Sequence, residues 1–329
     1  MINRVLIYNS GGGLGDSIQV LPLIDTLKKE FSASDFFYLG AHENHFNSAL
    51  KDFNSKIKTL DLGLKYFGFR WWHLFSVKNR IRKKNIEPFD LIIDLQSKIR
   101  NSLILKKIPH KYFISSCLNF NLCKPKINIK KEKKISNTIL NAINYIFKTQ
   151  YTIIDYDINK IDKSFFTESE KLLPKKNYIA FSITQGNIYR KKEWPLKNVI
   201  QLSSVLIKKN FIPVFFIDKK NASLKNKISN LLPEAVFPEY ETDLNSPALV
   251  TCLAKRVYFA ITIDNGVMHM IALAKTPMIS LFGPTDSEKF APDYKNSIIL
   301  DSKKIYKNNN VSLITAEDVL KAAEQHLNF

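Results

Sequence analysis

Short apolar runs alternate with stretches of helical periodicity along the chain. In the first half, the runs at residues 5–8, 36–39 and 89–95 predict buried strands, because they are short and rich in β-branched and aromatic residues. Apolar residues at helical spacing between 18 and 27 predict a helix after the first strand, and a second helical stretch runs to residue 105. This order of strand, turn, helix and strand is typical of a parallel α/β unit.

The same pattern restarts in the second half and predicts a second α/β unit. Strands are expected at 178–183, 212–217, 257–263 and 278–282, and helices at 196–208, 248–254 and 267–274. The tail at 315–327 predicts an amphipathic helix capped by Thr315, with Asp318 in its first turn. We therefore expect domains at 1–165 and 166–310, followed by a C-terminal helix within 311–329.

Composition excludes several classes of protein. The 329 residues are 45% hydrophobic and 24% charged, which is typical of a folded globular chain and not of a disordered one. No apolar run approaches the roughly 20 residues of a membrane-spanning helix, and the N-terminus does not resemble a secretory signal. Three cysteines without paired spacing indicate neither a disulfide framework nor a zinc site. We expect a cytoplasmic protein.

The net charge of +19 is unevenly distributed. Residues 61–135 hold 18 Lys and Arg against 5 Asp and Glu, which is +13 of the total, whereas residues 1–60 are neutral. Nucleic-acid binding, attraction to anionic lipid and a lysine-rich composition without function would each give a basic chain. A compositional bias should spread evenly, so the clustering favours one of the other two causes.

The first glycine-rich loop is Gly11-Gly12-Gly13-Leu14-Gly15-Asp16, between the first strand and its helix. Its spacing fits neither the dinucleotide fingerprint nor the phosphate-binding P-loop, and an acid here would repel a phosphate. The loop favours close approach of a neutral substrate to the backbone, with the Asp16 carboxylate beside it. The alternative is that Asp16 only favours the helix dipole.

Three loops of the second half follow predicted strands. Arg190, Lys191 and Lys192 follow the strand at 178–183, where cations suit a diphosphate, although a solvated basic loop is the alternative. In the turn at 264–269, helix N-terminal amides suit phosphate and Asp264 suits sugar hydroxyls, whereas a lone His269 is more often simply packed. The turn at 282–286 would lie at the same sheet edge.

Five motifs in this order resemble glycosyltransferase family 9, the ADP-heptose:lipopolysaccharide heptosyltransferases. They are GLGD with Pro22 six residues after the Asp, FDLIIDLQ at 89–96, G-x5-K-x-W-P at 186–195, D-N-G-x-M-H at 264–269 and FGPTD at 282–286. The resemblance implies a GT-B architecture, with two Rossmann-like domains whose parallel sheets face each other across a cleft. It also implies that the C-terminal helix packs back across the domain junction.

The resemblance implies an inverting, metal-independent transfer of heptose from ADP-heptose to a lipid-linked sugar, with no cofactor beyond this nucleotide diphospho-sugar. The family's general base corresponds to Asp16, and Lys192 to the lysine that neutralises the donor diphosphate. The positions expected at the donor are Gly186, Asn187, Lys192, Asp218, Asp264, Asn265, Gly266, Val267 and His269. Those expected at the acceptor are Gly13, Gly15, Gln96 and Arg100.

Departures from the family pattern leave the donor open. Asn265 replaces the usual Ser or Thr, and Asn187 and Ile188 replace hydroxyl residues before the lysine. Family members carry a glycine-rich turn and an acid after this strand, and the two hold the adenosine. This chain has the sequence from Asp218 to Asn221 there, so Asp218 is the remaining candidate for that contact. Another nucleotide-sugar or a protein acceptor stays possible, as does a non-catalytic nucleotide- or nucleic-acid-binding protein.

The stretch at 66–75 is aromatic and is followed by five cations between 78 and 84. Such a sequence suits a membrane interface, a single-stranded nucleic acid, or aromatic core residues beneath a charged surface. With the resemblance, we expect residues 66–135 to bind the cytoplasmic surface of the inner membrane beside an anionic glycolipid acceptor, and we expect no nucleic-acid partner.

Overall fold

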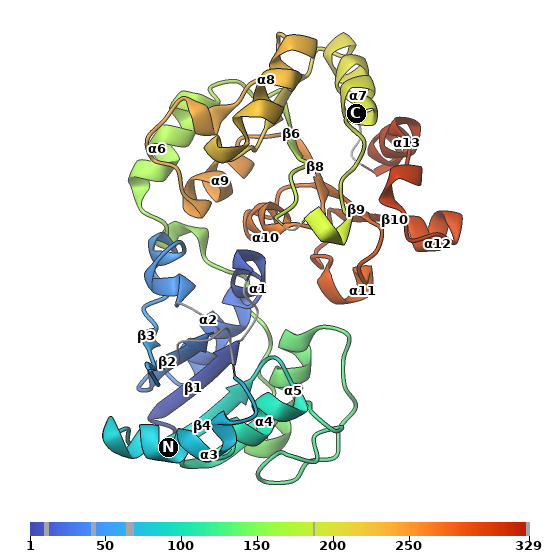
Figure 1. The fold of residues 1–329 in the computed structure, drawn as a ribbon. Helices are drawn as coiled ribbons and strands as arrows, with labels where there is room; N and C mark the ends of the chain where they lie inside the picture. The colour runs from blue at the N-terminus through green and yellow to red at the C-terminus, as the bar shows by residue number, and fades with distance from the viewer. Residues whose placement is uncertain (10–12, 41–43, 64–68, 187, 327–329) are drawn as a thin grey trace. The chain divides into compact units, whose positions relative to one another are not determined.

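The computed structural model describes residues 1–9, 13–40, 44–63, 69–186 and 188–326 (Figure 1). The chain forms two compact units, Met1–Asp157 and Ile158–Phe329. The sequence places the boundary after residue 165, but α6 (Lys163–Leu172) packs against α9 (Pro247–Ala254) and therefore belongs to the second unit. Of the residues described, no helix is both long and apolar enough to cross a membrane.

The first unit is built on a parallel five-stranded sheet in the order β3-β2-β1-β4-β5. The three predicted strands form its centre, and two edge strands flank them. The strands are β1 (Arg4–Asn9), β2 (Asp35–Gly40), β3 (Lys58–Thr59), β4 (Phe89–Asp94) and β5 (His110–Ser115). Central residues such as Leu6 and Ile92 are fully buried.

Helices cover the sheet of the first unit. The single helix expected at 18–27 is divided into α1 (Leu14–Ile18) and α2 (Leu21–Glu30), because Pro22 suits the first turn of a new helix. Apolar side chains of α3 and α4 pack with Leu6 and Ile92 in one core. The remaining helices are α3 (His73–Lys83), α4 (Ile99–Leu105), α5 (Ile135–Phe147), η1 (His45–Asn47) and η2 (Lys51–Phe53).

The second unit repeats the design with the strand order β10-β9-β8-β6-β7, again all parallel. Its strands are β6 (Tyr178–Ser182), β7 (Ile212–Phe215), β8 (Phe259–Ile263), β9 (Met278–Phe282) and β10 (Ser297–Asp301). Its other helices are α7 (Leu196–Lys208), α8 (Ala222–Leu231), α10 (Gly266–Leu273), α11 (Ser287–Phe290), α12 (Ser302–Tyr306) and α13 (Ala316–His326). Single 3-10 turns are η3 (Ile158–Lys160), η4 (Ile188–Arg190), η5 (Lys219–Asn221), η6 (Pro238–Tyr240) and η7 (Val311–Leu313).

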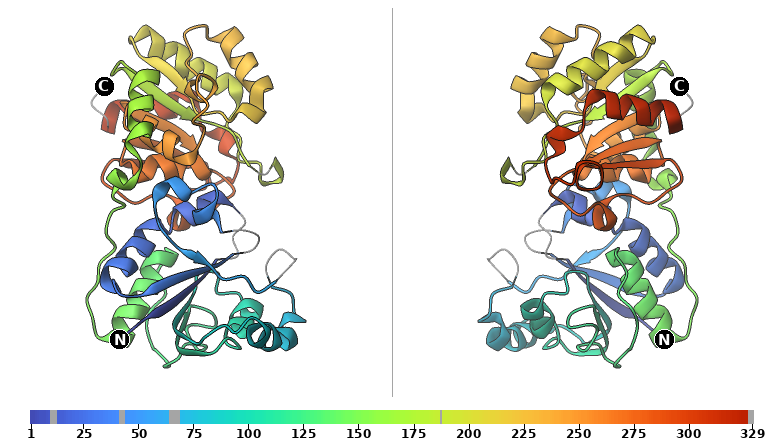
Figure 2. Two further views of the ribbon diagram at one scale, coloured as in Figure 1. Left: turned by 90° about the vertical axis from the view of Figure 1, so that its left-hand side faces the viewer. Right: turned by 90° about the vertical axis from the view of Figure 1, so that its right-hand side faces the viewer.

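The C-terminal helix α13 has the predicted cap. Asp318 N donates to Thr315 Oγ1 at 3.1 Å, and Thr315 N donates to Asp318 Oδ2 at 2.7 Å, so the two residues satisfy each other's amides. Val319 and Ala323 are buried, and the helix packs against α7, β9 and β10 of its own unit (Figure 2). Its packing across the domain junction stays a prediction.

The strand orders fix where ligands are expected. In each sheet the strand order reverses at one topological switch point, which lies between β1 and β4 in the first unit and between β6 and β8 in the second. Ligands of open parallel sheets bind in the crevice beyond the carboxyl ends of the strands at this switch point. The segments that leave β1, β4, β6 and β8 are those that carry the candidate motifs.

Candidate active site

Lys192 and Asp264 form the centre of the site in the second unit. Lys192 follows β6, Asp264 follows β8, and both residues are about nine-tenths buried. Lys192 Nζ donates to the Asp264 carboxylate and also to the Asp264 backbone oxygen at 3.1 Å. In this buried ion pair at the switch point each charge neutralises the other, and the lysine is a cation suited to an anionic ligand.

The segment before α7 explains why Lys192 is selected among three consecutive basic residues. Exposure alternates, so that Lys191 and Glu193 face solvent while Lys192 and Trp194 point inward. Trp194 Nε1 donates to the Ile314 backbone oxygen at 2.7 Å, and Lys192 N donates to Gln185 Oε1 at 2.9 Å. The tryptophan therefore anchors the loop to the segment before α13 and fixes the inward direction of the lysine.

Asn265 forms the N-cap of α10. Its Oδ1 accepts from Met268 N at 2.9 Å, while its Nδ2 donates to Ser182 Oγ at 2.8 Å and to the Thr184 backbone oxygen at 3.0 Å. The side chain thus ties the end of β8 to the end of β6. The amides of Gly266 and Val267 lie in the first helical turn, where the helix supplies no acceptor, so they suit a phosphate.

The remaining donor candidates differ in their surroundings. His269 is buried within α10, whereas Gly186 is exposed, with no heavy atom near the position of a Cβ. Asn187 lies outside the described residues. Asp218 is half exposed after β7, caps η5 by accepting from Lys220 N, and pairs with Lys220 at 3.2 Å.

Glu239 is a residue that sequence reasoning missed. It lies in η6, is 6% exposed, and sits close enough to Asp218 for the two charges to interact. Burial, and after it the charge of Asp218, raises the pKa of Glu239 to about 7. The available signal was an acid inside the apolar sequence Phe-Pro-Glu-Tyr. The end of β7 therefore carries two acids, not the one predicted.

In the first unit, Asp16 lies in α1 at the end of β1. The side chain is half-buried, and Gln19 Nε2 donates to its Oδ1 at 3.4 Å. A Cβ on Gly13 would lie 3.4 Å from Asp16 Oδ2, so the carboxylate turns back over the residue that begins the helix. Gly15 is half-buried beside it. Asp16 therefore lies beyond the carboxyl end of β1 at the switch point of the first sheet, where ligands of parallel sheets bind.

A chain of side-chain amides joins Asp16 to the end of β4. Asn9 Nδ2 donates to the Asp16 backbone oxygen at 3.1 Å, and Gln96 Nε2 donates to Asn9 Oδ1 at 2.8 Å. Asn9 is the last residue of β1 and is 2% exposed. Sequence reasoning selected Gln96 as an acceptor contact but missed Asn9, which links it to Asp16.

The turn that carries Gln96 is fixed by Asp94. The buried carboxylate accepts from Gln96 N and Ser97 N, both at 3.0 Å, and from Ser102 Oγ and Ser115 Oγ at 2.5 and 2.9 Å. Burial raises the pKa of Asp94 against these hydrogen bonds. Asp94 therefore has a structural role. Arg100 lies further along on α4, half-buried, with Nε donating to Asn101 Oδ1 at 3.5 Å.

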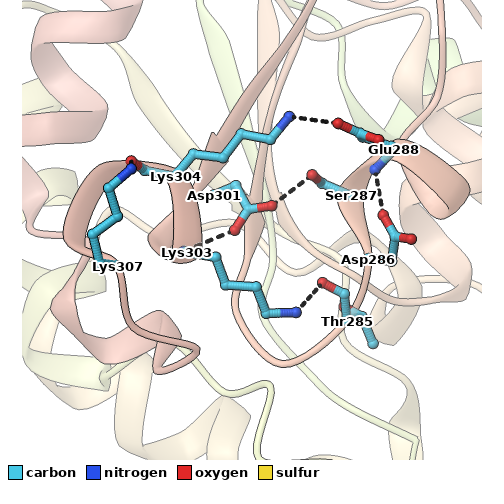
Figure 3. Close-up of a pocket in the computed structure, with 8 residues that line it drawn as sticks. All are labelled: Thr285, Asp286, Ser287, Glu288, Asp301, Lys303, Lys304 and Lys307. Carbon is cyan, nitrogen blue, oxygen red and sulfur yellow. Dashed lines mark hydrogen bonds and ion pairs between the residues drawn. The ribbon is translucent and has the colours of Figure 1, made fainter.

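The turn at 282–286 borders a pocket of about 430 Å³ (Figure 3). Its lysines already have partners. Lys303 Nζ donates to the backbone oxygens of Pro284 and Thr285, and Lys304 pairs with Glu288 at 3.3 Å. Gly283 is required by packing, because a Cβ there would lie 2.7 Å from Val311 N. The turn thus joins β9 to the segments after β10.

Known proteins share this architecture. The structure is similar to a family 9 glycosyltransferase from Veillonella parvula, with a TM-score of 0.69, 18% identity, and coverage of 99% of this chain and 97% of the other. It is also similar to E. coli ADP-heptose lps heptosyltransferase II, with a TM-score of 0.68, 16% identity, and coverage of 99% of each chain. Two Rossmann-like units, each built on a parallel sheet, are typical of the GT-B class of glycosyltransferases.

Sequence comparison gives the family. The model of glycosyltransferase family 9 (heptosyltransferase) matches residues 75–319, and the chain belongs to this family. Lipooligosaccharide heptosyltransferase 2 of Haemophilus influenzae is 29% identical over 108 residues. That match spans 31% of this chain and 30% of the relative. The protein is therefore a glycosyltransferase.

Proposed function

We propose that the protein transfers heptose from ADP-heptose to a lipopolysaccharide-type acceptor of the cell envelope, with inversion and without a metal ion, at the cytoplasmic face of the inner membrane. The observation that carries the proposal is the buried Lys192–Asp264 pair at the switch point of the second sheet, beside the N-terminus of α10. Membership of the heptosyltransferase family supports the sugar class.

The second unit binds the donor and stabilises the leaving group. The Lys192 ammonium and the amides of Gly266 and Val267 are suited to a diphosphate, while Asp264 is suited to sugar hydroxyls. As the bond between the anomeric carbon and the diphosphate breaks, negative charge develops on the leaving nucleoside diphosphate. A fixed cation in a site that excludes water stabilises that charge.

Asp16 in the first unit acts as the general base. The acceptor hydroxyl oxygen attacks the anomeric carbon from the face opposite the leaving group, which inverts the configuration. Its proton passes to the Asp16 carboxylate, and the electron pair of the broken bond stays with the diphosphate. Positioned proton transfer of this kind contributes about 10²- to 10⁴-fold in rate.

Metal independence is part of the proposal and has its own test. The chain contains one Asp-x-Asp sequence, Asp155-Tyr156-Asp157, in the segment that ends the first unit. Tyr156 is buried there, and its hydroxyl donates to the Phe53 backbone oxygen at 2.9 Å. Transfer activity should survive EDTA, whereas loss of activity on chelation and recovery with Mg²⁺ would contradict this part.

Substitutions at the two centres test the assignment of roles. We expect Asp16→Asn to lower kcat by about 10²- to 10⁴-fold with little change in donor binding. Lys192→Gln should lower kcat by about 10²- to 10³-fold and weaken donor binding, because it removes the fixed cation. The matched control is Lys197→Gln, an exposed lysine on α7. Transfer at the wild-type rate by Asp16→Asn would refute the base assignment.

The exposed Asp218 and the buried Glu239 favour a second candidate, the same reaction with a different nucleotide. The loop that holds adenosine in the family has a different sequence here, and Asp218 and Glu239 both lie at the end of β7. A thermal-shift series with ADP, UDP and GDP at equal concentration separates the two candidates, because the ligand that binds the folded state more tightly stabilises it more. A larger shift with UDP or GDP than with ADP would overturn ADP-heptose as the donor.

A further inference from the structure

Three large aromatic side chains are exposed within five residues at the start of α3. The exposed fractions of Trp71, Trp72 and Phe75 are 54%, 56% and 82%. The amides of Leu74 and Phe75 donate to the backbone oxygens of Trp71 and Trp72 at 3.0 and 3.2 Å, so helical geometry extends back to residue 71. Large aromatic side chains are usually buried on folding, so an exposed cluster of three indicates a surface that interacts with another molecule or a membrane.

The same face of the helix continues with cations. Phe75, Lys78, Asn79 and Arg82 follow one another at the i, i+3, i+4 and i+7 spacing, and all four are exposed. The opposite face, with His73, Val77 and Ile81, is buried in the core of the first unit. Over roughly 16 Å of helix, the outer face therefore changes from aromatic to basic. We call this face, Trp71 to Arg82, the α3 ridge.

Positive charge gathers around the root of the ridge. Burial, followed by the charges of Arg80, Arg70 and Arg100, lowers the pKa of His73. Some cations serve the fold, since Arg80 donates to the Leu62 backbone oxygen at 3.1 Å and Lys84 pairs with Asp61. Between Asp61 and Glu87, however, the sequence contains no acid. A partner with negative charge fits this surface, and a partner with positive charge does not.

We propose that the α3 ridge anchors the protein in the interface of an anionic lipid bilayer, with the aromatic rings at the level of the headgroups and Lys78 and Arg82 on anionic lipid. Exposed Trp and Phe beside cations on an amphipathic helix are suited to this position. The inference rests on the proposed function, because a membrane anchor serves an enzyme whose acceptor is a lipid-linked sugar at the bilayer surface.

Two other partners fit the ridge less well. A second copy of the chain, paired through this face, would bring the same excess of positive charge to it, and the sequence between Asp61 and Glu87 offers no acid to offset that charge. Single-stranded nucleic acid is bound in basic grooves whose walls follow its backbone, whereas the outer face of a helix is convex. Both remain measurable as outcomes of the test below.

The test uses the full chain with vesicles of phosphatidylethanolamine and phosphatidylglycerol, and with vesicles of phosphatidylcholine alone. We expect the protein to float with the anionic vesicles and not with the neutral ones. The tryptophan emission should move to shorter wavelength on binding. Trp71 and Trp72 report this change, because the third tryptophan, Trp194, is already buried.

Two variants and a matched control locate the surface. The triple variant Trp71→Ala, Trp72→Ala, Phe75→Ala should lose flotation. The triple variant Lys78→Glu, Arg82→Glu, Lys83→Glu should bind anionic vesicles about 100-fold or more weakly, since each cation near the surface contributes about five-fold. The control reverses exposed lysines of the second unit, Lys175, Lys176 and Lys255, and should float like the wild type. All altered residues are exposed, and melting temperatures check that each variant folds.

The outcomes separate this inference from the proposed function. Flotation of the aromatic variant like the wild type, or equal flotation with neutral vesicles, overturns the inference. A dimer of the wild type that the aromatic variant no longer forms also overturns the inference. So does an oligonucleotide that binds the wild type and not the aromatic variant, if the wild type does not bind vesicles. Stabilisation by ADP is measured on the same samples. If ADP does not stabilise the wild type, the ADP donor is refuted, and the result of the vesicle experiment is unaffected.

Discussion

At the scale of single residues, burial separates candidates that residue type alone does not. Arg190, Lys191 and Lys192 are chemically similar, and the resemblance to the family singles out Lys192. The alternation that turns Trp194 inward gives the physical reason, because it buries Lys192 as well. That tryptophan could be predicted to pack, but its hydrogen bond to the Ile314 oxygen joins residues far apart in the chain. Glu239 was missed because its one local signal, an acid inside the apolar sequence Phe-Pro-Glu-Tyr, does not show that it lies near Asp218, which is distant in the sequence.

We predict that Asn9 positions Asp16. Asn9→Ala removes its bond to the Asp16 backbone oxygen and the bond from Gln96, so we expect kcat to fall about 10- to 100-fold with donor KM unchanged. Steady-state kinetics of purified protein measure this split. Asn177→Ala, which removes an exposed amide bonded to the Asn210 oxygen in the second unit, is the control. An unchanged kcat in Asn9→Ala would show that the amide chain does not position the base.

Glu239 should make the stability of the second unit depend on pH. Its pKa is raised from 4.5 to about 7 in the folded state, so the folded state binds the proton more tightly than the unfolded state. The contribution of Glu239 to stability is therefore fully present below about pH 4.5 and is lost as pH rises through about 7, by about 3 kcal/mol at most.

Denaturant unfolding of wild type and Glu239→Gln between these pH values measures the difference. The glutamine cannot ionise, so the free energy of unfolding of the wild type relative to Glu239→Gln should fall across the window. Parallel curves would mean that the carboxyl group is not protonated in the folded state.

At the scale of elements, the apolar pattern predicted the central strands of each sheet and the edge strand β7, and it missed the edge strands β3, β5 and β10. The runs for β1, β4, β6, β8 and β9 are identifiable because central strands are buried on both faces. The edge strand β10 is only partly buried, and β5 begins with His110 and Lys111. Their positions depend on pairing with distant neighbours, which no local pattern records.

The turn after β9 gives a stability prediction at this scale. In Gly283→Ala the new Cβ would meet the backbone atoms Val311 N at 2.7 Å and Asn309 O at 2.8 Å, neither of which moves cheaply. We expect a loss of about 1–3 kcal/mol and a melting temperature lower by several degrees. Gly186→Ala, with nothing within 4 Å of the Cβ, is the stability control. Equal melting temperatures for the two variants would show that residues 309–311 can shift.

At the scale of the whole molecule, the sequence located the charge but not its use. The excess of +13 in residues 61–135 was visible from composition alone. The structure divides it between cations that hold the fold, such as Arg80 and Lys84, and those on the outer face of α3. Of the aromatic stretch at 66–75, Phe69 packs in the core, as one of the expected alternatives predicts. Three later rings are exposed, and their binding to a membrane stays a prediction.

The enclosure of Lys192 matters for how this lysine-rich protein can be handled. Reductive methylation, a common aid to crystallisation, modifies amines that water reaches. The ammonium group of Lys192 is shielded and bonded to Asp264, whereas lysines such as Lys83 and Lys176 are open to reagent. Chemical treatment of the surface lysines should therefore leave the Lys192 amine unmodified. Peptide mass mapping of the methylated protein would show methyl groups on Lys83 and Lys176 and none on Lys192.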